Sequence, residues 1–394
     1  MTTPTDESPI AMVPGPIEFD PEVLAAMSHS SQSHVAAPFI HTFQETLSLL
    51  RQLFFSTNPA DQGFVISGSG TLGWDLVAAN LIDASLESTK QALVINTGFF
   101  SDSFATCLGV YGAKVTNLAP PAVGSYPSLE SIESALKQTH YQVVTITHVD
   151  TSTGVLQNVQ EIASLIHRVS PCSFIIVDGV CSIGVENLQF SDWHIDFALT
   201  APQKAIGAPS GLSIAFASAR VLEYVEVTRK SPVPAFYADL KKWSSIMKAM
   251  EAGKPAYFAT PAVQNIHSLN VALHQIVSAG PGAILDRFTK HAEASNKIKD
   301  FVINDLGLQI VALDRDHAAN GMTAIYLPEG ITNAQLLPAM AAQGVVLAGG
   351  IHKEIATKYF RIGHMGVSVV DKSRVDVDYT LKTLKQVIKD LSKN

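Results

Sequence analysis

Short apolar runs alternate with segments of helical periodicity through the first half of the chain, and this alternation constrains the fold more than any other feature. The expected strands lie at residues 63–67, 92–96, 114–118, 142–147, 173–178 and 196–201. The expected helices lie at residues 72–86, 102–111, 130–138 and 159–169. The runs are rich in β-branched or aromatic residues and end at turn residues, as buried strands do. Strands that alternate with helices predict an α/β fold with a mainly parallel sheet and helices on both faces.

Two domains are expected from the length and from a change of pattern near residue 280. The chain has 394 residues, more than one ordinary domain holds. Residues 1–20 form a proline-rich arm, and residues 21–280 are expected to form a large domain that begins with a helix at 39–55. A long amphipathic stretch at 285–306 then precedes apolar runs at 323–327, 345–348 and 359–363 and a final helix. We therefore predict that residues 281–394 form a smaller α+β domain.

The composition predicts a soluble protein with a large core. Hydrophobic residues make up 47% of the chain and charged residues only 16%, so part of the surface is expected to be covered by a partner chain. The formal net charge is −8 and no cluster of lysine or arginine stands out. This charge argues against nucleic acid or an anionic membrane as a partner. No apolar stretch reaches the ~18 residues of a membrane span.

The cysteines and the two ends of the sequence favour a cytoplasmic location. Cys107, Cys172 and Cys181 form no ligand pattern with histidine, so neither a disulfide framework nor a metal site is expected. The acidic N-terminal segment contains no arginine, unlike a mitochondrial leader, and it does not resemble a secretory signal. The last residues, Leu-Ser-Lys-Asn394, are not a peroxisomal address.

A glycine-rich turn, Gly68-Ser-Gly-Thr-Leu-Gly73, follows one expected strand and precedes a helix. This spacing is typical of a dinucleotide-binding turn, which also requires an acidic residue at the end of the next strand. That strand ends at Asn96 without an acid. A helix N-terminus still offers free N–H groups to any phosphate, so the turn favours a different phosphate-bearing cofactor. A turn that serves packing alone is the alternative.

Asp178 and Lys204 each follow an apolar run. The carboxyl ends of strands in an open α/β sheet face the crevice where ligands bind. An isolated lysine is most often solvated, and an aspartate after a strand often satisfies a turn. Together they match pyridoxal 5'-phosphate chemistry, which uses a Schiff-base lysine and an acidic partner for the pyridinium nitrogen.

Three further positions are candidates because of where they stand. Phe100 follows the strand at 92–96, and an aromatic ring at the crevice could stack on a planar cofactor instead of filling the core. Thr151 belongs to a hydroxyl-rich run, residues 148–154, after another strand. Arg361 lies between apolar residues, where it would grip a substrate carboxylate or form a buried structural ion pair.

In these motifs the chain resembles the class V aminotransferases of pyridoxal-phosphate fold type I, and within them the alanine–glyoxylate and serine–pyruvate group. The resemblance covers nearly the whole chain in one order. It is carried by Pro14-Gly-Pro16, Ser67-Gly-Ser-Gly70, Thr151-Ser-Thr-Gly154, Val177-Asp178, Gln203-Lys204, Tyr257-Phe-Ala-Thr-Pro261 and Arg361-Ile-Gly363. The amino-acid sequences of residues 346–352 and 363–366 are most similar to those of the fungal members. The fold that it implies is a large domain around a mainly parallel, seven-stranded sheet, with a smaller C-terminal domain.

The resemblance also implies roles for individual residues. Lys204 would form the internal aldimine with the cofactor, and Asp178 would pair with its pyridinium nitrogen. The other cofactor contacts would come from the glycine turn, the ring-stacking position and the loops beside them: Ser69, Gly70, Thr71, Phe100, Thr151 and Gln203. Arg361 and Gly15 would bind the substrate.

In the family, the residues that match Tyr257 and Thr260 reach the cofactor phosphate of the neighbouring subunit. The resemblance therefore implies a homodimer with shared active sites. Thr71 stands where animal members commonly have histidine, and Phe100 where they have tryptophan. Phenylalanine still stacks, so these two departures bear on substrate preference more than on cofactor binding.

The implied reaction is a ping-pong transfer of the amino group of L-alanine to glyoxylate, which gives pyruvate and glycine and points to glycine biosynthesis. Serine–pyruvate or hydroxykynurenine transamination remains an alternative because the catalytic core is shared. A cysteine desulfurase is disfavoured because Gln203 stands where those enzymes typically have histidine. A non-catalytic relative is disfavoured because both Asp178 and Lys204 are present.

Overall fold

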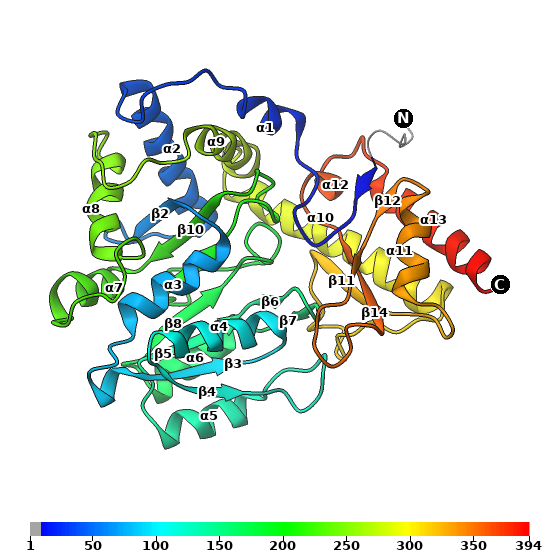
Figure 1. The fold of residues 1–394 in the computed structure, drawn as a ribbon, viewed down its shortest axis with the longest axis horizontal. Helices are drawn as coiled ribbons and strands as arrows, with labels where there is room; N and C mark the ends of the chain where they lie inside the picture. Colours follow the sequence, from blue (N-terminus) through cyan, green and yellow to red (C-terminus); the bar gives the residue numbers. More distant parts are fainter. Residues whose placement is uncertain (1–8, 394) are drawn as a thin grey trace.

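A computed structural model describes residues 9–393, and its large domain is built around a seven-stranded sheet (Figure 1). The strands are β2 (Gln62–Ser67), β3 (Gln91–Ile95), β4 (Lys114–Leu118), β5 (Val143–Thr147), β8 (Phe174–Asp178), β9 (Phe197–Thr200) and β10 (Leu212–Ala217). Their order across the sheet is β2-β10-β9-β8-β5-β3-β4. Strand β10 runs antiparallel to both of its neighbours, whereas the other pairings are parallel. The predicted α/β class with a mainly parallel sheet is therefore confirmed, although β10 was not predicted.

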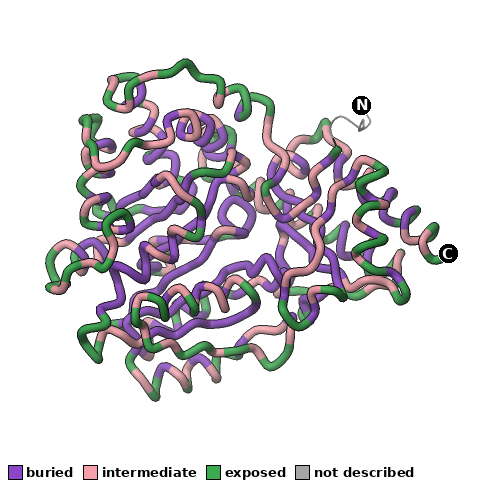
Figure 2. Tube along the Cα trace, in the orientation of Figure 1, coloured by how far each residue is buried: buried purple, intermediate pink, exposed green. Residues whose placement is uncertain are grey.

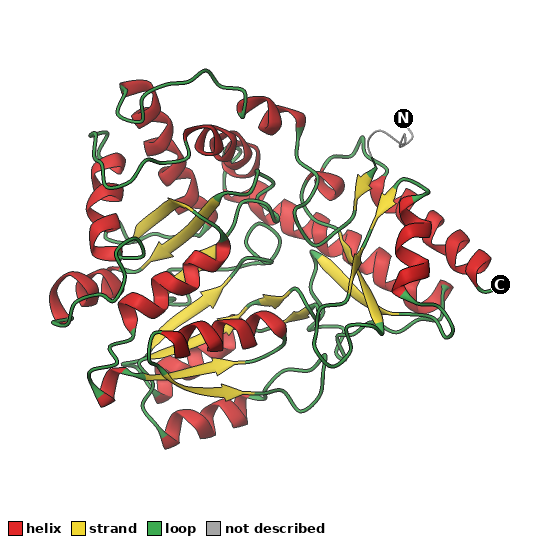
Figure 3. Ribbon diagram, in the orientation of Figure 1, coloured by secondary structure: helices red, strands yellow, loops and turns green. Residues whose placement is uncertain are grey.

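Helices lie on both faces of this sheet (Figure 3). In chain order they are α1 (Pro21–Ala26), α2 (Ala37–Leu53), α3 (Gly70–Leu81), α4 (Phe99–Val110), α5 (Leu129–Gln138), α6 (Val159–Val169), α7 (Ala219–Glu223), α8 (Leu240–Glu251) and α9 (Val263–Val277). Several N-termini have a side-chain cap of the expected kind. Ser128 accepts from the N–H of Ser131 at the start of α5, and Asn158 accepts from the N–H of Glu161 at the start of α6.

Two predicted helix boundaries were wrong, and side-chain hydrogen bonds explain both. Helix α3 ends at Leu81 and not near residue 86 because the chain turns at Asp83, whose Oδ1 accepts from the N–H of Ser85 at 3.1 Å. Helix α4 begins three residues earlier than predicted, at Phe99. There the carboxylate of buried Asp150 accepts from the N–H groups of Phe100 and Ser101 at 3.1 and 3.2 Å.

The C-terminal part of the chain contains a small three-stranded antiparallel sheet in the order β11-β14-β13. Its strands are β11 (Met322–Tyr326), β13 (Ala348–Gly349) and β14 (Tyr359–Gly363). Its helices are α10 (Pro281–Asp300), α11 (Asn333–Ala341), α12 (Val367–Val370) and α13 (Asp376–Leu391). The predicted amphipathic stretch corresponds to α10 and the π-helical turn Phe301–Asp305 that extends it. Two short pairs complete the described structure: the hairpin β6 (Val149–Asp150) with β7 (Val155–Leu156), and β1 (Ile10–Ala11) parallel to β12 (Val345–Val346).

Two large apolar cores follow this division. Figure 2 shows buried residues, in purple, in both parts of the molecule. One surrounds the seven-stranded sheet, and the other lies between the small sheet and α10, α11 and α13. Helix α10 contributes to both, through Ile284 in the first and Ile298 in the second. The N-terminal arm supplies Ile10 and Met12 to the second core. The boundary near residue 280 remains a prediction, and residues 1–8 of the predicted arm, like residue 394, lie outside the described residues.

Candidate active site

A cavity of about 190 Å³ lies at the edge of the large sheet where β2, β5, β8 and β9 end. The residues around it come from the first two turns of α3, the start of α4, the strand ends and the loops that follow the strands. They are Ser69, Gly70, Thr71, Trp74, Phe100, Thr147, Val149, Thr151, Asp178, Val180, Cys181, Gln203 and Lys204. Eight of the predicted site residues are thus brought together, although they are spread along more than 130 positions of the chain. The parallel strands cause this convergence because their carboxyl ends share one edge.

Lys204 lies in the turn after β9 and is partly buried. Its ammonium group donates a short hydrogen bond to the carbonyl oxygen of Pro14 in the N-terminal arm. Burial lowers the pKa of Lys204, the Arg361 guanidinium lowers it further, and the Asp178 carboxylate raises it. A lowered pKa brings a lysine toward the range in which it acts as a nucleophile or base.

Asp178 is the last residue of β8, and its carboxylate is held by two donors. The backbone N–H of Val180 donates to Oδ1 at 3.0 Å, and the indole Nε1 of Trp74 donates to Oδ2 at 2.8 Å. Burial raises the pKa of Asp178 to about 6, and these two hydrogen bonds and Lys204 oppose that rise. At neutral pH the carboxylate is therefore mostly ionised.

The glycine turn forms the N-terminus of α3 at the same cavity. Ser69 is the N-cap residue, and its side chain does not bond to the helix, so its hydroxyl group can bind another partner. A Cβ atom at Gly70 would stand 3.1 Å from Cγ2 of Val180 and 3.2 Å from Cβ of Ala201. Only glycine fits this approach without displacing a neighbour. Backbone N–H groups at the first turn of a 12-residue helix form an anion site of the kind that binds phosphate.

Gln203 and Thr151 provide polar atoms on the loops beside Lys204 and Asp178. Within the described residues, the buried Oε1 of Gln203 has no hydrogen-bond partner. Such an atom costs free energy unless a ligand or water pairs with it. The carbonyl oxygen of Thr151 accepts from Nη1 of Arg361 at 3.1 Å. Phe100 lines the cavity from the first turn of α4.

Arg361 lies on β14 of the small sheet, is 9% exposed and reaches the large domain through Thr151. Its Nε donates to the carbonyl oxygen of Gly349 at 2.8 Å. Neither of these hydrogen bonds uses Nη2. The prediction of a guanidinium that is not solvated on all sides is confirmed, and its positive charge lowers the pKa of Lys204.

Gly15 lies directly over Lys204. Its φ is +111°, and a Cβ atom built there would be 2.7 Å from Nζ of Lys204. Gly363 N–H donates to the carbonyl of Met12 at 2.8 Å, and Ile17 N–H donates to the carbonyl of Gln203 at 3.1 Å. The arm is therefore fastened to both domains, and Gly15 is the residue that leaves room for the lysine.

Tyr257 and Thr260 do not reach the cavity of their own chain. Both are exposed, and the ring of Tyr257 packs against that of His34 at 5.2 Å. They lie in the loop between α8 and α9. Their role at the site of another subunit therefore stays a prediction.

The sequence did not identify Trp74 or Cys181 as cavity residues. Trp74 follows Gly70 by one helical turn, and residues four apart in a helix share a face. That spacing was the signal available for Trp74. Cys181 lies three residues after Asp178 in the loop that leaves β8, and the sequence carries no comparable signal for it.

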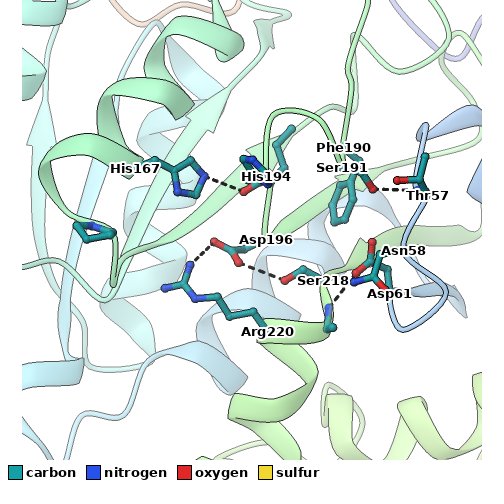
Figure 4. A pocket seen from close by; sticks show the side chains of 13 residues that line it. Thr57, Asn58, Asp61, His167, Phe190, Ser191, His194, Asp196, Ser218 and Arg220 are labelled. Carbon is teal, nitrogen blue, oxygen red and sulfur yellow. Dashed lines mark hydrogen bonds and ion pairs between the residues drawn. The ribbon is translucent and has the colours of Figure 1, made fainter.

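A larger hollow, of about 710 Å³, lies at the opposite edge of the sheet (Figure 4). Its charged residues are already paired within the protein: Arg220 donates to Asp196 at 2.9 Å, and Asp61 accepts from Ser56 and from the N–H of Ala219. This hollow lies at the amino ends of β8 and β9, away from the edge where α/β sheets bind ligands. We therefore assign these residues to structure.

Comparisons with known proteins agree with this geometry. The model of the family described as aminotransferase class-V matches residues 22–368. Alanine–glyoxylate aminotransferase 1 of Saccharomyces cerevisiae is 44% identical over 367 residues, which cover 92% of this chain and 93% of that protein. Serine–glyoxylate aminotransferase of Arabidopsis thaliana is 26% identical over 364 residues, which cover 90% of this chain and 84% of that protein. The crystal structure of an alanine–glyoxylate aminotransferase from Nostoc sp. superimposes with a TM-score of 0.86 at 25% identity, covering 98% of this chain and 96% of that one.

Proposed function

Because the chain belongs to the class-V aminotransferases, which depend on pyridoxal 5'-phosphate, we propose that it transfers the amino group of L-alanine to glyoxylate and forms pyruvate and glycine. The observation that best supports transaminase activity is that Asp178 and Lys204 meet at one cavity beside a helix N-terminus. The choice of substrates rests on the yeast relative, which is 44% identical over nearly the whole chain.

The residues around the cavity fit the cofactor. The backbone cradle at Gly70 suits the phosphate, Phe100 offers a flat face to the ring, and Asp178 offers a carboxylate to the ring nitrogen. The Oε1 of Gln203, which has no hydrogen-bond partner in the described part of the chain, provides a further polar contact. When bound, the cofactor supplies an electron sink for the charge that develops on the substrate α-carbon, and it carries the amino group between the two half-reactions.

Lys204 is proposed to hold the cofactor and to move the proton at the substrate α-carbon. Burial lowers its pKa, so the ε-amino group is more readily available as a base than that of an exposed lysine. Asp178 is proposed to stay ionised and to keep the ring nitrogen protonated. Its two fixed hydrogen bonds prevent the carboxylate from turning away from the cavity.

Arg361 is proposed to bind the carboxylate of the amino acid or keto acid. A guanidinium offers two parallel N–H donors to a carboxylate, which fixes the substrate in orientation as well as in place. Gly15 is proposed to close the substrate side of the site from the N-terminal arm. These two residues come from opposite ends of the chain, so the substrate site depends on the contact between the arm, the small sheet and the large domain.

The colour of the bound cofactor tests this proposal. Purified protein loaded with pyridoxal phosphate should be yellow, lose the colour with L-alanine and regain it with glyoxylate. Lys204→Ala should form no bond that borohydride can reduce, and its rate should fall by several orders of magnitude. Rapid turnover of serine with pyruvate, and none of alanine with glyoxylate, would replace the substrate pair but keep the mechanism. Formation of alanine from cysteine, with sulfide released when a thiol reductant is added, would instead indicate a desulfurase.

We also propose a homodimer in which Tyr257 and Thr260 contact the partner's cofactor. The exposed side chains of Phe236 and Tyr257, which are 76% and 62% accessible, support it because large apolar residues on an open surface favour a partner chain. Mixing two inactive variants, Lys204→Ala and Tyr257→Ala, tests the sharing of sites. Subunit exchange should restore activity, since one site of each mixed dimer has both native residues. A mixture that stays inactive after proven exchange contradicts the shared site.

A further inference from the structure

We propose that Trp74 is a positioning residue for Asp178: its indole N–H fixes the carboxylate that faces the ring nitrogen of the cofactor. The inference rests on the proposed function, because it assumes that pyridoxal phosphate occupies the cavity. Trp74 belongs neither to the glycine turn nor to the Asp178–Lys204 pair.

The indole ring is held firmly in place. Trp74 is 8% exposed and lies in the second turn of α3, on the cavity side. Its ring stacks on Phe104 of α4 with centroids 5.5 Å apart and planes 15° apart. It also contacts Phe100 at 6.5 Å with the planes tilted by 60°. Both aromatic neighbours come from α4, and the Nε1–H of the ring donates to Oδ2 of Asp178.

With the hydrogen bond from Trp74, each carboxylate oxygen of Asp178 accepts a hydrogen bond from the protein. Val180 N–H holds Oδ1 at 3.0 Å, and Trp74 Nε1 holds Oδ2 at 2.8 Å. With both oxygens held, the carboxylate plane is fixed, yet each oxygen retains acceptor capacity because it has two lone pairs. Without the indole N–H, one oxygen is released and the carboxylate can rotate about the Cβ–Cγ bond.

The same bond also affects protonation. A hydrogen bond to the charged form of an acid lowers its pKa, so the indole opposes the rise that burial causes at Asp178. Its loss should make the carboxylate more basic. A more basic partner draws the shared proton away from the ring nitrogen, which weakens the ring as an electron sink.

Trp74→Phe is the central variant, because it keeps an aromatic ring between Phe100 and Phe104 but removes the donor. Tyr111→Phe is the matched control. Its hydroxyl donates to Asp75 at 2.8 Å, so this variant also removes an aromatic donor to a carboxylate on α3, but Asp75 does not line the cavity. Phe104→Leu removes the stacking partner and leaves the indole N–H in place.

The first readout is the ¹⁵N resonance of the ring nitrogen in holoenzyme loaded with ¹⁵N-labelled pyridoxal phosphate. We expect Trp74→Phe to move this resonance toward the unprotonated value at neutral pH, while Tyr111→Phe and Phe104→Leu leave it near that of the wild type. The acid limb of the kcat/KM profile for L-alanine should move to higher pH by about one unit. The value of kcat should fall about tenfold to a hundredfold, as for one hydrogen bond to a charged group, with KM little changed.

The outcomes separate this inference from the proposed function. If the wild-type protein binds no pyridoxal phosphate, the proposed function fails. If the wild type binds it and Trp74→Phe matches the wild-type resonance and pH profile, the role of Trp74 is refuted. If Phe104→Leu shifts the resonance as much as Trp74→Phe does, Trp74 acts through packing and the hydrogen bond is not the cause.

Discussion

At the scale of single residues, burial moves the pKa values of the two central groups in opposite directions. It lowers the pKa of Lys204 and raises that of Asp178, because a low-dielectric site disfavours both charged forms. Each group partly offsets the shift of the other, since opposite charges favour one another. Binding of a cationic ring nitrogen would stabilise the ionised form of Asp178 further. The Asp178 carboxylate is therefore less stabilised in the cofactor-free site than in the loaded one.

Arg361→Lys should damage substrate binding without affecting the cofactor. Lysine keeps the positive charge but cannot replace the planar pair of donors or the bonds to Gly349 and Thr151. We expect kcat/KM for L-alanine to fall about 100-fold, which corresponds to about 3 kcal/mol. Single-turnover loss of the yellow colour measures this, and the dissociation constant of the cofactor should stay the same. Arg220→Lys, at the opposite edge of the sheet, is the control.

Gly15→Ala should hinder the reaction of Lys204 with the cofactor. The new Cβ would lie 2.7 Å from Nζ, and φ at this position is +111°. Gly330→Ala is the matched control, because φ there is +79° but no atom from elsewhere in residues 9–393 lies within 4 Å of the new Cβ. Both variants should lose about 1 kcal/mol of stability through the backbone. Only Gly15→Ala should slow the appearance of colour when pyridoxal phosphate is added, and equal rates would contradict the contact.

At the scale of elements, the site depends on how strand ends and loops from the two domains are tied together. The hydroxyl of Tyr359, on β14, donates to the carbonyl of Ser152 at 2.6 Å. It also accepts from the N–H groups of Ile351 and His352 at 2.9 and 3.0 Å. One buried phenol therefore joins the β6–β7 turn of the large domain to the loop after β13. The exposed ion pair between Lys353 and Asp102 spans nearby elements, but such pairs contribute little.

Tyr359→Phe should destabilise the protein by about 2–3 kcal/mol, since it leaves three backbone groups without their buried partner. A lower melting temperature and a higher KM for the amino acid are expected, because Arg361 lies two residues further along the same strand. Tyr379→Phe is the control: it removes one bond, to the carbonyl of Gln343, near the surface. A Tyr359→Phe protein as stable as the control would show that the phenol does not tie the domains.

At the scale of the whole molecule, the large and small cores meet along α10, and several ionisable groups are buried there. Arg287 of α10 donates to the carbonyls of Gly184 and Ala205, and His291 accepts from the N–H of Gly366. Burial lowers the pKa of His291 and that of His364 to about 3. These histidines are neutral in the folded protein, so acid should favour unfolding.

His364→Gln should reduce the sensitivity of the cofactor-free protein to acid. The pKa of His364 is about 3 when folded and about 6.5 when unfolded, so only the unfolded state takes up this proton between those values. The stability that His364 contributes is complete above pH 6.5 and is lost at about 1.4 kcal/mol per pH unit as pH falls toward 3. Asp178 and the other buried acids with raised pKa values act in the opposite sense, and the comparison of variants cancels them.

Urea unfolding between pH 7 and 4.5 measures this effect. The slope of unfolding free energy against pH should be smaller in His364→Gln than in the wild type. His140→Gln, at an exposed position, should retain the wild-type slope. Identical slopes in wild type and His364→Gln would show that His364 is charged in the folded state.

The sequence by itself determined the parallel strands of the large sheet, the edge that carries the site and the residues at or just beyond the strand ends there. Apolar periodicity is a local property, and the carboxyl end of a strand is fixed once the strand is, so Asp178 and Lys204 could be located without a structure. Only the tertiary structure decided the contacts between distant segments. One example is the antiparallel insertion of β10. Two others are the contact of Trp74 with Asp178, 104 positions apart in the chain, and that of Arg361 with Thr151, 210 positions apart. Such contacts depend on how whole elements pack, and no local pattern records which side chains then meet.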